Sequence, residues 1–143
     1  MTNMIPQAPN NNQQTWARLE DYTRDLVQAG NEVYVIMGSY GVGGTGSMGP
    51  KTTIDNRRVT VPSQIWKVIV VLPEGEDDVS RITTSTRVIA VNTPNTNSVN
   101  PSWGSYRISV DAIEAATGYD LLSNLPNNIE ATLEGKTDTG PTQ

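Results

Sequence analysis

A helical spacing of core-type residues is the first pattern along the chain, and it predicts a helix from about residue 12 to residue 28. The residues that set the spacing are Trp16, Leu19, Thr23, Leu26 and Val27. Asn10 or Asn11 is suited to cap the start of this helix, and Gly30 is suited to end it. We therefore expect the chain to begin its folded part with an amphipathic helix.

Runs of apolar residues predict the strands. Residues 33–37, 66–72 and 87–91 are rich in Val, Ile and aromatic side chains, which favour strands. The run over 66–72 is almost unbroken, so we expect a strand buried on both faces. Residues 59–61 form a shorter candidate at a sheet edge. Together with the first helix, these strands predict a mixed α/β or an α+β domain.

The remaining segments are polar or rich in Gly, Pro and Asn. We expect a flexible loop over 38–50, a loop over 92–104, and an acidic turn over 74–78. A short helix is predicted at 110–117, with Ser109 as its N-cap and Gly118 as its stop. The other predicted segments are a second short helix at 127–135, a folded domain over 1–136 and a flexible tail over 137–143.

The composition narrows the chemistry. The 143 residues fit one domain, and the net charge of −5 argues against a broad basic surface for nucleic acid. The chain has no Cys and no His, which excludes thiolate sites and any imidazole base supplied by this chain. The first residues have neither a basic nor an apolar stretch, so we expect no signal peptide here.

Two short motifs carry little weight. Residues 41–46 match the pattern G-x-G-x-x-G, but a nucleotide site needs a helix to begin at the third glycine. Gly49 and Pro50 follow instead, so we favour a surface loop. The acidic residues of 74–78 lack the alternating spacing of a calcium loop, and a solvated turn explains them better.

Four polar or aromatic residues recur every fourth position in the first helix: Asn12, Trp16, Glu20 and Arg24. At about 100° per residue, Asn12 points along the core stripe, and Glu20 and Arg24 lie on its shoulder. One interpretation is a capping Asn followed by a surface Glu–Arg pair. The other is an oxygen ligand, an acid and an arginine facing one cleft, which suits phosphodiester hydrolysis. The spacing leaves both open.

Several motifs in the same order resemble the DNA/RNA non-specific endonucleases, also called ββα-metal nucleases. The likeness runs over residues 1–135, and the cyanobacterial members look most similar. The motifs are 3–7 (Asn-Met-Ile-Pro-Gln), Asn12, 16–20 (Trp-Ala-Arg-Leu-Glu), Arg24, 59–62 with 66–72, 87–92 with 94–95, Trp103, Tyr106, 109–114, 117–118 and Asp120.

The resemblance implies a role for each residue that matches the family's site. Asn12 matches the asparagine that binds one divalent metal, mostly Mg²⁺, although Mn²⁺ is also expected to serve. Glu20 matches the acid that organises the metal's water molecules, and Arg24 matches an arginine on the scissile phosphate. Asn3 matches a further active-site asparagine. The resemblance also implies DNA and RNA as substrates, a protein inhibitor as a partner, and a secreted or periplasmic location.

One departure from the family pattern decides what the chain is expected to do alone. The family's general base is the histidine of an Asp-Arg-Gly-His motif, carried on a hairpin before this region, and this chain has no histidine. The resemblance therefore implies a nuclease-like α+β fold, with a mixed, mainly antiparallel sheet and packed helices, that is incomplete at its N-terminus. It also implies an N-terminal half with that motif as a partner. The chain alone should be inactive.

Two other functions stay open from the sequence. One is a non-catalytic binding protein on a nuclease-derived scaffold, and the other is an Asn-, Thr- and Gly-rich extracellular binding module. The retention of Asn12, Glu20 and Arg24 together favours the nuclease, because a binding scaffold has no need of a metal ligand.

Overall fold

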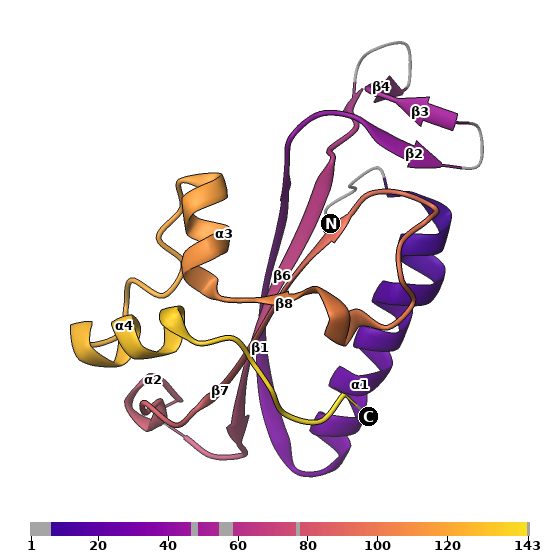
Figure 1. Ribbon diagram of the computed structural model, residues 1–143. Helices are drawn as coiled ribbons and strands as arrows, with labels where there is room; N and C mark the ends of the chain where they lie inside the picture. Colours follow the sequence, from indigo (N-terminus) through magenta and orange to yellow (C-terminus); the bar gives the residue numbers. More distant parts are fainter. Residues whose placement is uncertain (1–6, 47–48, 55–58, 77, 143) are drawn as a thin grey trace.

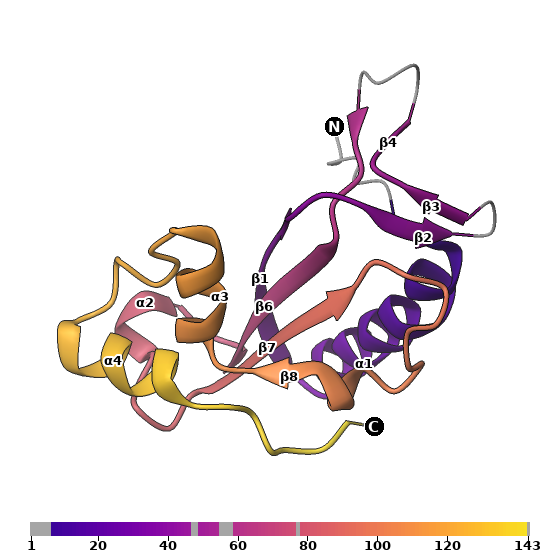
Figure 2. The same cartoon turned by 45° about the horizontal axis from the view of Figure 1, so that its top comes forward.

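The protein is layered, with one long helix on one face of a central sheet and two short helices on the other (Figure 1 and Figure 2). The computed structural model describes residues 7–46, 49–54, 59–76 and 78–142. None of the described helices is both long enough and apolar enough to span a membrane.

The central sheet has four strands, all antiparallel, in the order β1-β6-β7-β8. Their bounds are β1 (Asn31–Tyr40), β6 (Gln64–Pro73), β7 (Arg87–Pro94) and β8 (Arg107–Ile108). β6 has a strand on each side and a layer on each face. This position explains its unbroken apolar run and confirms the prediction of a doubly buried strand.

The two faces of β6 pack against different helices. Trp66, Val68 and Val70 belong to the core under the short C-terminal helices, whereas Ile69 packs beneath the long helix. Successive side chains of a strand point to opposite faces, so Lys67, between Trp66 and Val68, lies on the long-helix side.

The three predicted helices lie at the expected positions, and two short helices that were not predicted, α2 and η2, accompany them. A π-helical segment η1 (Asn11–Trp16) runs into α1 (Ala17–Gln28); the others are α2 (Asp78–Arg81), the 3₁₀ helix η2 (Trp103–Tyr106), α3 (Val110–Thr117) and α4 (Asn127–Gly135). The Ser109 hydroxyl accepts a hydrogen bond from the Ala112 N–H at 3.2 Å, which confirms the N-cap. Gly118 ends α3 with a φ of 80°, as expected of a C-terminal glycine.

The glycine-rich segment is more ordered than the predicted flexible loop. β2 (Gly44–Gly46) pairs with β3 (Gly49–Lys51), and β4 (Thr53–Ile54) pairs with β5 (Val59–Thr60). Gly46 is the last residue of β2, so the third glycine of the G-x-G-x-x-G pattern does not begin the helix that a nucleotide site needs. At Gly44 a Cβ atom would lie 2.7 Å from the Asn95 carbonyl oxygen, so this glycine serves close backbone packing.

The C-terminal segment is also held, although the sequence predicted a flexible tail over 137–143. The Asp138 carboxylate, only 5% exposed, bonds Arg87 at 2.8 Å and Arg107 at 2.9 Å. The Arg87 guanidinium also donates to the Pro141 carbonyl at 2.6 Å. Two arginines from separate strands therefore fix this segment, and no local sequence pattern reveals such long-range pairs.

Candidate functional site

Asparagine side chains anchor the start of the long helix. The Ala8 N–H donates to the Asn95 amide oxygen at 2.6 Å, and the Asn10 amide donates to the Asn97 carbonyl at 2.6 Å. The Asn10 N–H in turn donates to the Asn97 side-chain oxygen at 3.0 Å. These bonds join segments 87 residues apart in sequence, so the 92–104 loop fixes where the helix begins.

The next turn is fixed from the same side. The Thr15 hydroxyl donates to the Asn100 carbonyl at 2.8 Å, and the Trp16 indole N–H donates to the Thr93 hydroxyl at 3.0 Å. That hydroxyl donates onward to the Ile65 carbonyl at 3.1 Å. Trp16 thus anchors the helix in the core, in agreement with its place in the apolar arc.

The π-helical turns change which asparagine is buried. A count of 100° per residue placed Asn12 along the core stripe, but the structure buries Asn11 completely and exposes Asn12. The reason is that η1 uses i→i+5 hydrogen bonds, which widen each turn and change the angle between residues. The helical-wheel prediction for Asn12 was therefore wrong.

The capping interpretation fails in both of its parts. The Asn12 N–H donates to the Ala8 carbonyl at 3.0 Å, so Asn12 lies within the first turn, and Asn10 makes no side-chain cap. Arg24 pairs with Asp21, not with Glu20. The expected capping asparagine and Glu–Arg pair are both absent from the described residues.

Asn12 and Glu20 therefore have side-chain oxygens without a partner. Both side chains are exposed, and neither forms a hydrogen bond or ion pair with another described residue. Amide and carboxylate oxygens are ligands that hard divalent cations prefer, directly or through water. Both side chains are therefore of the chemical type that an Mg²⁺ or Mn²⁺ site uses. Asn3, the other predicted site residue, lies outside the described residues.

Lys67 is a charged neighbour that the sequence analysis missed. It is 7% exposed, and its Nζ lies 4.3 Å from the centroid of the Trp16 ring. Burial lowers the pKa of Lys67, and the nearby Glu20 carboxylate partly offsets that effect. The available signal was a single charged residue inside an otherwise apolar strand, which marks a position with a polar neighbour.

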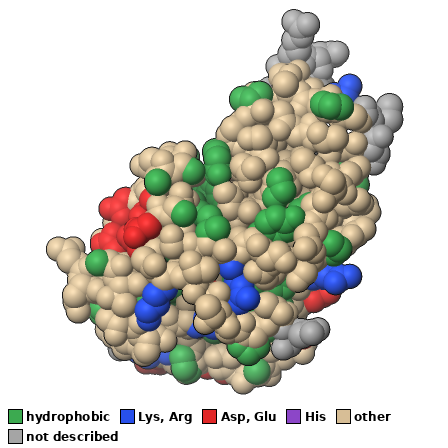
Figure 3. Space-filling view, in the orientation of Figure 1, with side chains coloured by type: hydrophobic (Ala, Val, Ile, Leu, Met, Phe, Trp, Pro, Cys, Tyr) green, Lys and Arg blue, Asp and Glu red, His purple; other side chains and the backbone are tan. Residues whose placement is uncertain are grey.

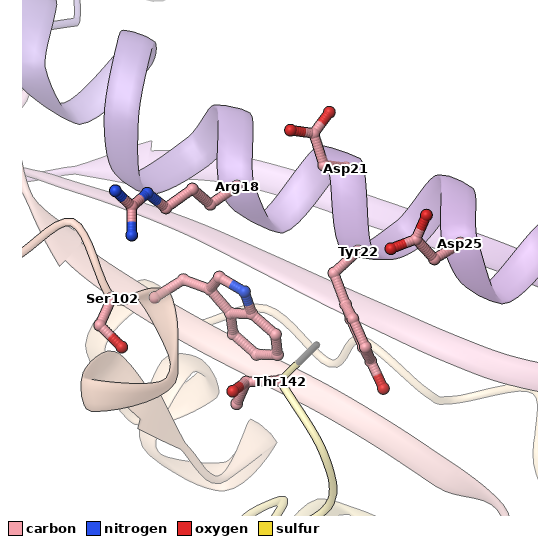
Figure 4. Close-up of a pocket in the computed structure, with 7 residues that line it drawn as sticks. Arg18, Asp21, Tyr22, Asp25, Ser102 and Thr142 are labelled. Carbon is pink, nitrogen blue, oxygen red and sulfur yellow. The ribbon is translucent and has the colours of Figure 1, made fainter.

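A hollow of about 400 Å³ lies on the other flank of α1 (Figure 4). Its lining residues are Arg18, Asp21, Tyr22, Asp25, Ser102, Trp103 and Thr142. None of Asn12, Glu20 and Arg24 lines it, so the candidate residues and this hollow are separate features. Tyr22 and Trp103 pack here with ring centroids 5.4 Å apart.

Comparison with known proteins agrees with this fold. The family model for DNA/RNA non-specific endonuclease matches residues 1–128. A nuclease of Nostoc sp. is 46% identical over 96% of this chain, and a nuclease of Serratia marcescens is 30% identical over 95%. This chain spans 47% of the length of each relative.

A solved structure has a similar fold. A chain from the crystal structure of the EndoG/EndoGI complex, titled as a mechanism of EndoG inhibition, superimposes with a TM-score of 0.60. The two sequences are 22% identical, and the match covers 87% of this chain and 50% of that one. The predicted α+β nuclease fold is confirmed, and the chain belongs to the DNA/RNA non-specific endonuclease family.

Proposed function

We propose that this chain is part of a metal-dependent endonuclease that hydrolyses phosphodiester bonds of DNA and RNA without sequence specificity. The observation that carries the proposal is the exposed flank of the long helix, where Asn12 and Glu20 have oxygens without internal partners. An exposed polar side chain bonds to water rather than to the protein, so its oxygens are available to an external ligand. The hydrogen bonds that anchor the helix hold these oxygens in place.

Each residue on this flank has a distinct role. The Asn12 amide oxygen would hold one Mg²⁺, or Mn²⁺ in its place, and the Glu20 carboxylate would orient water at the ion by accepting hydrogen bonds. When bound, the ion stabilises the negative charge that develops on the phosphate. Asn3 is proposed as a further polar contact of the same site.

Arg24 is the phosphate-binding residue in this proposal. It now pairs with Asp21, and the two side chains are 65% and 66% exposed. An exposed pair of this kind contributes at most about 1 kcal/mol, so a substrate phosphate can replace Asp21 at small cost. Arginine suits this role because its guanidinium donates two parallel hydrogen bonds to phosphate oxygens.

The general base must come from outside this chain, because the chain has no histidine. We propose that an N-terminal half with the Asp-Arg-Gly-His motif supplies it, in the same polypeptide or as a second chain. That this chain spans 47% of the Nostoc and Serratia relatives supports a complement of similar size.

The exposed side of β1 is the proposed docking site for that half. β1 is at the edge of the described sheet and pairs only with β6. Tyr34 is 45% exposed beside an apolar groove of about 390 Å³, and Val35 and Met37 are exposed on the opposite face of the strand. A long edge strand with apolar side chains on both faces is normally covered in the folded protein.

Complementation tests this function directly. An N-terminal half from a related nuclease is joined to this chain, and cleavage of supercoiled plasmid and of RNA is measured with Mg²⁺. We expect cleavage at least about 10²-fold faster than by the chain alone, because general-base catalysis contributes about 10²–10⁴-fold. The matched control replaces the motif histidine by alanine. A folded, joined protein that cleaves neither polymer would contradict the proposal, as would robust cleavage by the chain alone.

A further inference from the structure

Five carboxylates gather on the face of the sheet opposite the long helix. They come from α3, from α4 and from the connection between them: Asp111, Glu114, Asp120, Glu130 and Glu134. Figure 3 shows an acidic patch over this part of the molecule. The site proposed above lies on the long helix, so this cluster is a separate feature.

The fold brings the two helices together at their ends. Ser109, just before α3, and Thr137, just after α4, form an antiparallel β-bridge. The bridge places Asp111 and Glu114 beside Glu134, and one carboxylate oxygen from each lies within 4.8 Å of the other two. The cluster is therefore set by the chain topology rather than by one flexible loop.

Glu134 is the centre of the cluster. Its oxygens lie within 4.8 Å of a second pair as well, Asp120 and Glu130. The residue is only 5% exposed, and its Oε2 atom has no hydrogen-bond partner. A buried carboxylate oxygen without a partner is costly to a fold, which points to a ligand that is needed to complete it.

No lysine or arginine in the described part of the chain pairs with these carboxylates. Among the described residues, no ion pair joins any of the five carboxylates to a lysine or arginine. Burial, together with the adjacent Glu114 and Glu130 carboxylates, raises the pKa of Glu134 to about 8. Glu114 and Glu134 also lie in the last turns of their helices, where the helix dipole favours a positive charge.

We propose that α3 and α4 hold a calcium ion, with Glu134 as the buried ligand. Two oxygens bound to Ca²⁺ at about 2.4 Å are at most about 4.8 Å apart, which matches the spacing within each set of three. The ligands are all oxygens, and clustered carboxylates of variable geometry suit Ca²⁺ better than Mg²⁺, which demands a strict octahedron. The site binds the two helices together and covers the core between them.

The test is calcium binding by the chelator-treated chain. Calorimetric titration with CaCl₂ is combined with thermal unfolding in Ca²⁺, in Mg²⁺ and in chelator. We expect Ca²⁺ at about a hundredfold excess over its Kd to raise the unfolding temperature by roughly 5–10 °C, with Mg²⁺ giving a smaller shift. No calorimetric binding and no shift at millimolar Ca²⁺ would overturn the proposal.

Variants separate this site from other effects of calcium. Glu134→Gln should weaken binding at least about tenfold, and Glu130→Gln provides a second variant at the rim in case the buried change disturbs folding. Glu76→Gln, an exposed acid outside the cluster, is the matched control and should keep the full shift. Asn12→Ala should keep it too. A shift unchanged in both cluster variants, or lost in Asn12→Ala, would rule this site out.

Discussion

The polar residues on the two flanks of α1 differ in whether they have partners within the protein. We call the flank with Tyr22 the Tyr22 flank, and the flank with Asn12 and Glu20 the Asn12 flank. On the Tyr22 flank, the Tyr22 hydroxyl accepts a hydrogen bond from Arg87 at 2.5 Å, and Arg87 and Arg107 both bind Asp138. On the Asn12 flank, Asn12 and Glu20 make no bond within the described residues. The same helix therefore contacts a hydrogen-bonded network on one flank and has exposed side chains without internal hydrogen bonds on the other.

This difference in pairing indicates which flank contributes to stability and which is available for function. A polar group that is buried and fully paired contributes to the fold, and its removal leaves a partner without a bond. An exposed group without a partner contributes little to stability, so its substitution changes the free energy of unfolding only slightly. We expect substitutions on the Asn12 flank to change activity, and substitutions on the Tyr22 flank to change the free energy of unfolding.

The largest expected effect is on the Asn12 flank. In the joined enzyme, Asn12→Ala should lower the cleavage rate at least about 100-fold, because alanine has no oxygen for the metal. Its free energy of unfolding should change by less than about 0.5 kcal/mol. Cleavage is measured across a Mg²⁺ titration and unfolding by urea. Gln13→Ala, at the adjacent exposed position, is the control; an unstable but fully active Asn12→Ala would remove the distinction between the flanks.

The next effect is on the Tyr22 flank. Asp138→Asn should lower the free energy of unfolding by about 2–3 kcal/mol at pH 7, because it leaves two part-buried arginines without their carboxylate. Asp25→Asn, an exposed acid on the same flank, should change it by less than about 0.5 kcal/mol. Equal effects of the two substitutions in urea unfolding would contradict this account.

The same carboxylate predicts a pH dependence. Burial alone would raise the pKa of Asp138, but hydrogen bonds from Arg87 and Arg107 outweigh it and lower the pKa. A depressed folded-state pKa gives stability that is full above the unfolded value of about 3.9 and is lost as pH falls below it. The difference between wild type and Asp138→Asn should therefore shrink between pH 5 and pH 2. A difference that stays constant would show that the charge is not its source.

A smaller effect is expected where the helix is anchored. Thr93→Val keeps the side-chain shape but removes the acceptor of the Trp16 indole N–H, so it should cost about 1–2 kcal/mol. A double-mutant cycle with Trp16→Phe isolates that bond, and its coupling energy should be about 1 kcal/mol. A coupling energy of zero would mean that packing alone holds Trp16.

The smallest effect is expected at the exposed ion pair. Asp21→Asn releases Arg24 and should change the free energy of unfolding by less than about 0.5 kcal/mol. In the joined enzyme it should leave the cleavage rate unchanged or slightly higher, because Arg24 no longer has to leave Asp21 before it binds the substrate phosphate. Urea unfolding and plasmid cleavage check both parts, and a large loss of cleavage would assign the catalytic role to Asp21 instead.

Local rules predicted most of the elements from the sequence. Strand β6 follows from its own apolar run, and α3 follows from Ser109 and Gly118 at its two ends. These signals lie within a few residues of the elements that they predict, so the sequence pattern is enough to place both. Asp138 bonds Arg107 and Arg87, which lie 31 and 51 positions away in the sequence, and no periodic pattern predicts such pairs. Lys67 was missed because its relation to Glu20 exists only after α1 packs on β6.

The candidate site itself was found by resemblance and not by geometry. The count of 100° per residue placed Asn12 in the core because it assumed an α-helix. The sequence pattern does not predict a π-helical segment. The resemblance supplied the roles of Asn12, Glu20 and Arg24, while the structure supplied a different fact, that the first two have no internal partners.

The π-helical segment makes the alignment of this flank depend on chain length as well as on residue identity. The turns of η1 hold more residues than α-helical turns, so the deletion of one exposed glutamine, such as Gln13, would change the direction in which Asn12 faces relative to Glu20. Every proposed ligand would remain in the sequence. The identities of the ligands therefore do not specify this flank by themselves, because the number of residues between them sets their directions.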